Sequence, residues 1–151
     1  MLAGQLALLT AALFAGAALY INVVEQPARL GLDNRSLLTE WKPAYKRGTV
    51  MQAPLAIIGF LLGLAAWWQT RHAGWAVGAL LMIANWPVTF FAIMPTNRRL
   101  MAIEPATADS QSRALIEKWG SLHAVRTVFG IAACLAFLWA SLASAEAGLK
   151  A

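Results

Sequence analysis

Four long apolar stretches, separated by polar segments, dominate the sequence. They cover residues 2–24, 50–68, 74–94 and 122–142, and each is close to the ~20 residues that a helix needs to cross a bilayer. None alternates as a barrel strand does, and an open sheet in lipid would leave backbone N–H and C=O groups unpaired. The pattern therefore predicts an all-α, integral membrane four-helix bundle, a single transmembrane domain over residues 1–151.

Composition favours a membrane protein over a soluble one. The chain is 60% hydrophobic and only 13% charged, which leaves too few charges to cover a water-exposed surface. The first apolar stretch is interpreted as a retained helix, because no Lys or Arg precedes it and it exceeds the ~7–15 apolar residues of a signal peptide. The single cysteine, Cys134, lies in the fourth stretch and excludes a disulfide framework.

Basic residues are concentrated in two of the three connections. The first and third connections carry Arg29, Arg35, Lys42, Lys46, Arg47, Arg98, Arg99, Arg113 and Lys118. Only Arg71 and Lys150 lie opposite, so the positive-inside rule predicts that these connections are cytoplasmic and both termini outside, in a bacterial inner membrane. Orientation thereby accounts for the net charge of +5, and nucleic acid is excluded as a partner because no basic soluble face is predicted.

Polar side chains gather on the side with the long connections. Pro43 suits the first turn of a helix, so the second helix is expected to begin near Lys42. On one face of it lie Trp41, Tyr45, Thr49 and Gln52, at spacings of four, four and three. Residues 109–118 predict a short amphipathic helix before the fourth membrane helix, whose inner end carries Trp119, His123 and Arg126 on one face.

The first and third helices end on the same side. They bring Tyr20, Asn22, the segment Glu25-Gln26-Pro27, Asn85, Thr89 and Asn97 there. Pro87 removes a backbone donor inside the third helix and predicts a kink. Gln52, Asn85 and Thr89 lie deep enough that they are expected to bond neighbouring helices or to face a hydrated cavity.

Arg126 lies one turn inside the fourth helix, where a guanidinium requires a carboxylate or a bound anion. Glu25 is a natural partner, so a structural Arg126–Glu25 ion pair competes with a ligand site. His72 and His123 are expected at opposite membrane faces, separated by about 30 Å, which disfavours a bis-His haem or a histidine-rich copper or iron site. One cysteine excludes an iron–sulfur cluster, and no glycine-rich dinucleotide motif is present.

Taken together, these residues resemble the DUF1772 family, whose best-known members are the anthrone oxygenases of polyketide pathways. The resemblance rests on Glu25-Gln26-Pro27, Trp41 with Tyr45 and Gln52, Asn85-Trp86-Pro87-Val88-Thr89, Met94-Pro95-Thr96-Asn97-Arg98-Arg99-Leu100, and Trp119 through His123 to Arg126. It implies a four-helix membrane protein and, for some members, an oxygenase that converts an anthrone into an anthraquinone without metal or flavin.

The resemblance and the spacing together suggest a membrane-embedded, cofactor-independent monooxygenase that uses O2 on a lipophilic, enolisable aromatic substrate. His123 would be the base, Arg126 would stabilise the enolate, and no residue would bind a metal. Substrate would be bound by Glu25, Trp41, Tyr45, Gln52, Asn85, Thr89, Asn97 and Trp119. The predicted partners are the lipid bilayer, the lipophilic substrate and O2, with a homo-oligomer left open. A carrier or binding protein for a lipophilic small molecule and a non-catalytic membrane subunit remain as alternatives.

Overall fold

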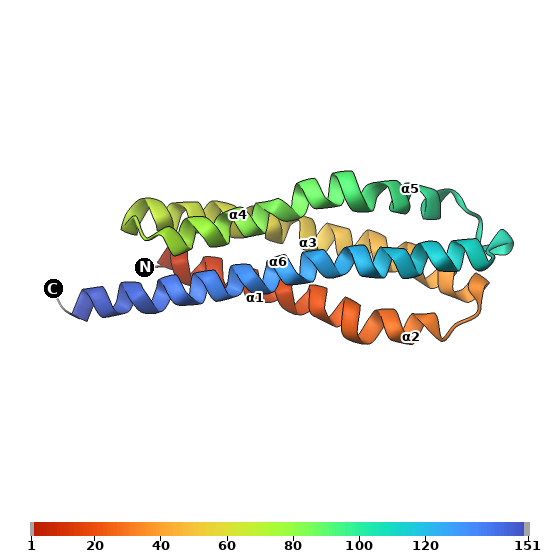
Figure 1. Ribbon diagram of the computed structural model, residues 1–151, viewed down its shortest axis with the longest axis horizontal. Coiled ribbons are helices and arrows are strands. Elements are labelled where there is room, and N and C mark those ends of the chain that lie inside the picture. The colour runs from red at the N-terminus through yellow and green to blue at the C-terminus, as the bar shows by residue number, and fades with distance from the viewer. Residues whose placement is uncertain (1, 150–151) are drawn as a thin grey trace.

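The protein is a bundle of four long antiparallel helical rods (Figure 1). The computed structural model describes residues 2–149, and Lys150, counted above for orientation, lies outside them. The first rod comprises α1 (Leu2–Tyr20), the π-helical η1 (Ile21–Glu25) and α2 (Gln26–Leu30). The second is α3 (Asn34–Thr70). The third comprises α4 (Ala73–Val88), the π-helical η2 (Thr89–Ile93) and α5 (Met94–Ala102). A 3₁₀ turn, η3 (Pro105–Thr107), leads to the fourth, α6 (Ser110–Leu149).

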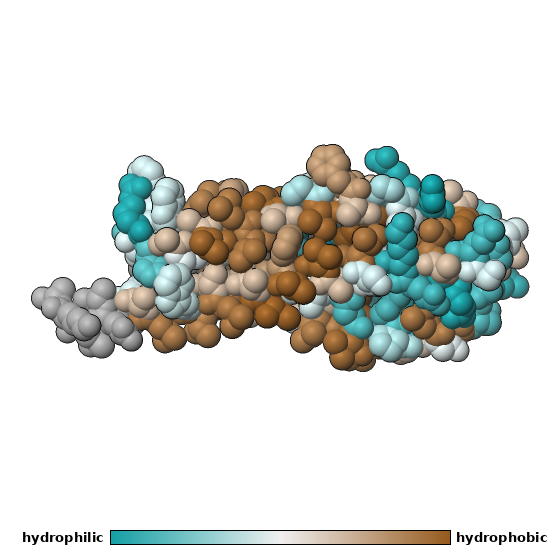
Figure 2. All heavy atoms as spheres, viewed as in Figure 1, coloured by the Kyte–Doolittle hydropathy of each residue, from teal (hydrophilic) through white to brown (hydrophobic). Residues whose placement is uncertain are grey.

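The predicted all-α four-helix bundle is confirmed, and all four rods are long and apolar enough to cross a membrane. Figure 2 shows hydrophobic residues over the middle of the bundle and hydrophilic residues gathered at the end where α2 and α5 lie. A smaller hydrophilic group lies at the other end, beside the α3–α4 turn. The α1 helix begins and α6 ends at that second end (Figure 1).

Two helix starts differ from the prediction. The second helix does not begin near Lys42 but at Asn34, because Asp33 Oδ1 accepts hydrogen bonds from the amides of Arg35 (3.0 Å) and Ser36 (3.1 Å). Pro43 therefore lies inside α3. The amphipathic segment before the fourth crossing forms the first turns of α6 without a break.

Each π-helical segment ends just before a proline. The Gln26 N–H donates to the Ile21 carbonyl and the Met94 N–H to the Thr89 carbonyl, and Pro27 and Pro95 follow directly. Proline has no N–H and crowds the carbonyl four residues back, so the widened turn accommodates it without breaking the rod. Pro87, where a kink was expected, lies two residues before the second of these segments.

Two hydrophobic cores fill the bundle. The first, here called the alanine-rich core, contains Ala7, Ala11, Phe14, Ala18, Ala56, Ala66, Trp75, Met82, Ala133, Phe137 and Ala140. The second, the polar-end core, contains Leu37, Leu38, Trp41, Ile93, Leu100, Ile116 and Trp119. Helices approach closely in the first, since a Cβ on Gly78 would lie 2.4 Å from the Phe137 ring.

Candidate active-site cavity

A cavity of about 170 Å³ lies where the two cores meet, lined by residues of all four rods. An apolar cavity of roughly this size accepts a benzene ring. The lining includes nine of the ten predicted site residues, namely Glu25, Tyr45, Gln52, Asn85, Thr89, Asn97, Trp119, His123 and Arg126. The helix faces of α3 and α6 that were predicted from residue spacing therefore both border this cavity.

Trp41 does not line the cavity. Its ring stacks on Tyr45 (centroids 5.0 Å apart, planes at 4°) and meets Trp119 edge-on at 5.7 Å. It is fully buried behind these two side chains. Trp41 therefore supports two aromatic walls of the cavity from behind rather than forming a wall itself.

Several buried amide groups of the cavity have no hydrogen-bond partner among the described residues. Gln52 is 1% exposed, and neither its Oε1 nor its Nε2 is paired. The Asn85 side-chain nitrogen donates to the carbonyls of Leu81 and Met82, both at 3.1 Å, but its Oδ1 is unpaired, as is that of Asn97. An unpaired buried polar group costs about 1–3 kcal/mol, so a polar ligand or water here would recover part of that cost.

His123 is held by a hydrogen-bonded group from the first rod. Its Nδ1 lies 2.9 Å from Asn22 Oδ1, which also accepts from Thr127 Oγ1 at 2.7 Å. The Asn22 side-chain nitrogen donates to the Gly120 carbonyl at 2.9 Å. The sequence placed Asn22 at the correct end of the first helix but not among the site residues, because its direction is determined by the π-helical turn that contains it.

Arg126 has neither an ion pair nor a hydrogen bond to any other described residue. Its guanidinium carbon lies 5.5 Å from the centre of the Phe14 ring, and its Nε is buried and unpaired. The considered Arg126–Glu25 pair is not formed. The cavity therefore presents a cation that has no carboxylate paired with it among the described side chains, those of residues 2–145.

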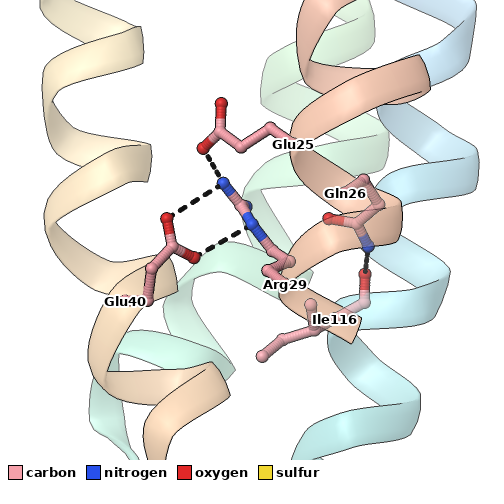
Figure 3. Close-up of polar contacts among 5 residues, drawn as sticks. All are labelled: Glu25, Gln26, Arg29, Glu40 and Ile116. Atoms are coloured by element: carbon pink, nitrogen blue, oxygen red, sulfur yellow. Dashed lines mark hydrogen bonds and ion pairs between the residues drawn. The ribbon is translucent and has the colours of Figure 1, made fainter. Parts of the chain in front are cut away.

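Glu25 pairs instead with Arg29, as Figure 3 shows. Arg29 also contacts Glu40, with Nε 3.0 Å from Oε2 and Nη2 3.4 Å from Oε1. Its side chain is buried and its Cζ lies 5.8 Å from the Trp119 ring. Arg29, counted above as a connection charge, is thus an internal residue of the cavity wall, and its charge is balanced by two carboxylates.

Gln26 fastens the same segment to α6. Its side-chain nitrogen donates to the Ile116 carbonyl at 2.9 Å (Figure 3). The contact is close, since a Cβ on Gly120 would lie 2.8 Å from the Gln26 side-chain nitrogen. The segment that carries Glu25 and Arg29 is therefore hydrogen-bonded to the helix that carries His123.

A second cavity opens between the first rod and α3. It shares Ile21, Glu25, Ala44 and Gly48 with the first cavity. A Cβ on Gly48 would meet nothing within 4 Å. Gly48 thus leaves free space between the two cavities, through which a ligand larger than one ring could extend.

Metal ligands are not gathered at this place. Among the side chains that the structure describes, residues 2–145, no three of His, Cys, Asp or Glu are grouped closely enough to hold a metal ion. His72 caps α4 at the opposite end of the bundle from the cavity, and its Nδ1 accepts from the Gly74 N–H at 3.2 Å. Cofactor independence remains a prediction, to be tested on the purified protein.

Together the cavity offers one imidazole, one unpaired guanidinium, three buried amides and aromatic walls. An imidazole can accept a proton, and a guanidinium in an apolar site stabilises the negative charge that proton removal creates. Flat aromatic walls suit a planar ligand. The arrangement is therefore suited to deprotonating a flat, weakly acidic molecule.

Comparison with known proteins points to one family. A family model described as anthrone oxygenase matches residues 41–136. The anthrone oxygenase tpcL of Aspergillus fumigatus is 30% identical over 133 residues, which cover 82% of this chain and 83% of that protein. An anthrone oxygenase of Claviceps purpurea is 26% identical over 144 residues, covering 85% and 82%. No solved structure matches the chain.

Proposed function

Because the chain belongs to the anthrone oxygenase family, we propose that it is a membrane-embedded, cofactor-independent monooxygenase of a lipophilic, enolisable aromatic substrate. The observation that carries this proposal is that His123 and Arg126 line the same largely apolar cavity and that Arg126 has no ion pair among the described residues. An anthrone is such a substrate. Its ring methylene group is linked to a carbonyl through the fused aromatic rings, so loss of a methylene proton gives an aromatic enolate.

The proposed reaction converts one ring methylene group and one O2 into one ring carbonyl and one water. His123 removes a proton from the methylene carbon, and Arg126 stabilises the negative oxygen of the enolate. The enolate carbon then gives electrons to O2 and forms a C–O bond, and the resulting peroxide takes up a proton. Loss of the second C–H proton forms the new carbonyl as the O–O bond breaks, and the departing oxygen leaves as water. The substrate supplies all four electrons, so no external reductant is needed.

The other cavity residues would bind and orient the substrate. The unpaired amide of Gln52 can donate to or accept from its oxygen substituents, and the unpaired Oδ1 atoms of Asn85 and Asn97 can accept from its hydroxyl groups. Tyr45 and Trp119 offer flat faces. The Thr89 hydroxyl donates to the Asn85 backbone carbonyl at 2.7 Å, so it is already bonded within its own helix. The Glu25 carboxylate, paired with Arg29, would limit how far the negatively charged enolate oxygen of the substrate can extend toward that side of the cavity.

The test is oxygen consumption by the purified protein in detergent or nanodiscs. With an anthrone as substrate, we expect one O2 consumed per quinone formed, above the uncatalysed rate, in protein free of metal, haem and flavin by elemental analysis and absorption spectroscopy. His123→Ala protein is the matched control. Activity that follows a stoichiometric metal or a Soret band would contradict cofactor independence.

We further propose that the bundle lies in a bacterial inner membrane with the α2–α3 and α5–α6 connections in the cytoplasm. The apolar middle of the bundle and the basic residues of those connections support this (Figure 2). In a Cys134→Ser background, Arg35→Cys should react with an impermeant maleimide only after the cells are opened. Labelling in intact cells would reverse the orientation.

A carrier for the same class of molecule is the second candidate. The second cavity between the first rod and α3 favours it, because it continues the binding cavity toward the outside of the bundle. The same assay separates the two functions. A carrier would bind the anthrone, seen as quenching of tryptophan fluorescence, without raising the rate of O2 consumption.

A further inference from the structure

The hydrogen bonds around Asn22 determine which nitrogen of His123 carries the proton. The Asn22 side-chain nitrogen lies 2.9 Å from the Gly120 carbonyl oxygen, which only accepts hydrogen bonds. The amide is therefore oriented with Nδ2 toward Gly120 and Oδ1 toward α6. A flipped amide would place two oxygens against each other at this distance.

Oδ1 of Asn22 is then purely an acceptor, shared by two groups of α6. The Thr127 hydroxyl donates to it at 2.7 Å, and His123 Nδ1 lies 2.9 Å away. Because an amide oxygen cannot donate, Nδ1 of His123 must carry the hydrogen. In neutral His123 the hydrogen-free nitrogen is consequently Nε2.

Nε2 is the nitrogen available to a ligand. His123 lines the cavity while Asn22 does not, so the ring edge away from Asn22 is the one turned to the cavity. No hydrogen bond to Nε2 is formed by any of the described residues. A neutral imidazole in water favours the opposite tautomer, with the proton on Nε2, which would point a donor instead of a base at the substrate.

We propose that Asn22 is a positioning residue, which keeps His123 in the Nδ1–H tautomer and so directs the Nε2 lone pair into the cavity. The tautomer follows from the hydrogen bonds alone, and its catalytic consequence rests on the proposed function. Hydrogen-bond partners fix the tautomer of metal-binding histidines in the same way, and removing such a partner costs roughly 10- to 100-fold in metal affinity or activity.

His72 is an internal control for the measurement. The protein contains only two histidines. Nδ1 of His72 accepts from the Gly74 N–H at 3.2 Å, so neutral His72 must carry its proton on Nε2. The two histidines are therefore expected in opposite tautomers, and each reports on conditions that would shift both.

The experiment is ¹⁵N NMR of protein labelled only at histidine, at a pH where both rings are neutral. The wild-type protein should show one Nδ1–H and one Nε2–H imidazole, with a His72→Gln variant assigning the signals. Asn22→Leu should move His123 toward the Nε2–H form and leave His72 unchanged. Asn22→Asp, which keeps the acceptor, and Thr127→Val, which leaves Asn22 in place, should both retain Nδ1–H. A wild-type His123 with its proton on Nε2, or an Asn22→Leu protein that keeps Nδ1–H, would overturn the proposal.

Steady-state kinetics test the catalytic part separately. Asn22→Leu should lower kcat roughly 10- to 100-fold with little change in KM, and Asn22→Asp should restore most of it. An unchanged kcat in Asn22→Leu protein whose His123 tautomer has shifted would overturn this part. If the wild-type protein oxidises no anthrone, the proposed function fails, while the NMR result still decides the tautomer.

Discussion

The two helical hairpins of the bundle, residues 2–70 and 73–149, share a pattern but differ in chemistry. The first carries Trp41-x3-Tyr45-x3-Thr49-Val50 and the second Trp119-x3-His123-x3-Thr127-Val128. The first rod of one hairpin and the third rod, which begins the other, match as well. Gln26-Pro27-x-Arg29 and Met94-Pro95-x-Asn97 each follow a π-helical segment. The matching tryptophans meet each other across the bundle, with ring centroids 5.7 Å apart.

The differences between matching positions divide the cavity into two walls. Tyr45 and Gly48 of α3 correspond to His123 and Arg126 of α6. The first and third rods correspond in the same way: Asn22 matches Phe90, Glu25 matches Ile93, and Arg29 matches Asn97. One wall, from the first rod and α6, therefore carries all the charges and the imidazole. The other, from α3 and the third rod, is neutral and carries the deep amides of Gln52 and Asn85.

The frame, the helical backbone shared by the two hairpins, is therefore separable from the chemistry of the side chains it carries. Both hairpins position a side chain four residues after a buried tryptophan toward the same cavity. Only one of these side chains is an imidazole, and only there does an asparagine from the neighbouring rod bond it. Exchanges between matching positions can therefore test whether function depends on the residue or on the frame.

The largest effect is expected from the imidazole and its counterpart. His123→Ala should lower anthrone turnover ~10²- to 10⁴-fold, the usual loss when a general base is removed. Tyr45→Phe, at the matching position, should keep most of the turnover. Both variants should remain folded, as judged by circular dichroism and size-exclusion chromatography. Equal losses in the two variants would mean that the charged wall has no special role.

The two arginines of the charged wall should separate catalysis from stability. Arg126→Gln should lower turnover roughly 10²- to 10³-fold, as loss of an oxyanion-stabilising donor does, with little change in melting temperature because Arg126 has no ion pair among the described residues. Arg29→Gln should lower the free energy of unfolding by about 1.5–3 kcal/mol, because Glu25 and Glu40 lose their partner. Thermal and denaturant unfolding measure both. An Arg126→Gln protein that unfolds as easily as Arg29→Gln would assign Arg126 a structural role.

The fold was predictable because the four apolar stretches are long enough to specify helices regardless of the loops. The residues at which the helices begin and end were harder to predict. The start of α3 depends on the Asp33 cap, whose two amide contacts outweigh the preference of Pro43 for a first turn. The first rod continues through Pro27 because the π-helical turn accommodates the proline.

The candidate site was predictable where the helices are regular. On α3 and α6, spacings of three and four place Tyr45, Gln52, His123 and Arg126 on the cavity side. On the first rod the π-helical turn inserts extra length, so the 3.6-residue period no longer tells where Asn22 and Arg29 point. Glu25 pairs with Arg29 at the i,i+4 spacing of an ordinary helical ion pair, and Glu40 contacts Arg29 from α3.

A smaller effect is expected at the glycine that matches Arg126. Gly48→Leu adds a side chain where a Cβ meets nothing within 4 Å, and leucine favours a helix more than glycine does, so the protein should fold without a fall in melting temperature. The added side chain should close the space between the two cavities. KM for a three-ring anthrone should then rise more than KM for a single-ring enolisable analogue. An equal rise for both would mean that the second cavity does not hold part of the substrate.

The smallest effects concern the caps, where the hairpins again match but differ in detail. Asp33 caps α3 through the amides of Arg35 and Ser36, whereas Asp109 and Ser112 at α6 bond each other reciprocally at 2.9 Å. Asp33→Ala removes both bonds of its cap, while Asp109→Ala leaves Ser112 Oγ to accept from the backbone. The melting temperature should therefore fall more in Asp33→Ala than in Asp109→Ala.

The charge of Asp33 adds a pH dependence that its amide analogue lacks. Hydrogen bonds from Ser36, and a further one from the Arg35 amide, lower the pKa of the Asp33 carboxyl from its ordinary value of 3.8. A lowered pKa stabilises the folded state above the ordinary value, and this contribution is lost as the pH falls through the lowered one. The side-chain amide introduced by Asp33→Asn still caps the helix but does not titrate. The difference in melting temperature between wild type and Asp33→Asn should accordingly be largest near neutral pH and should shrink below about pH 4. A difference that stays constant down to about pH 2 would show that the cap acts through hydrogen-bond geometry alone.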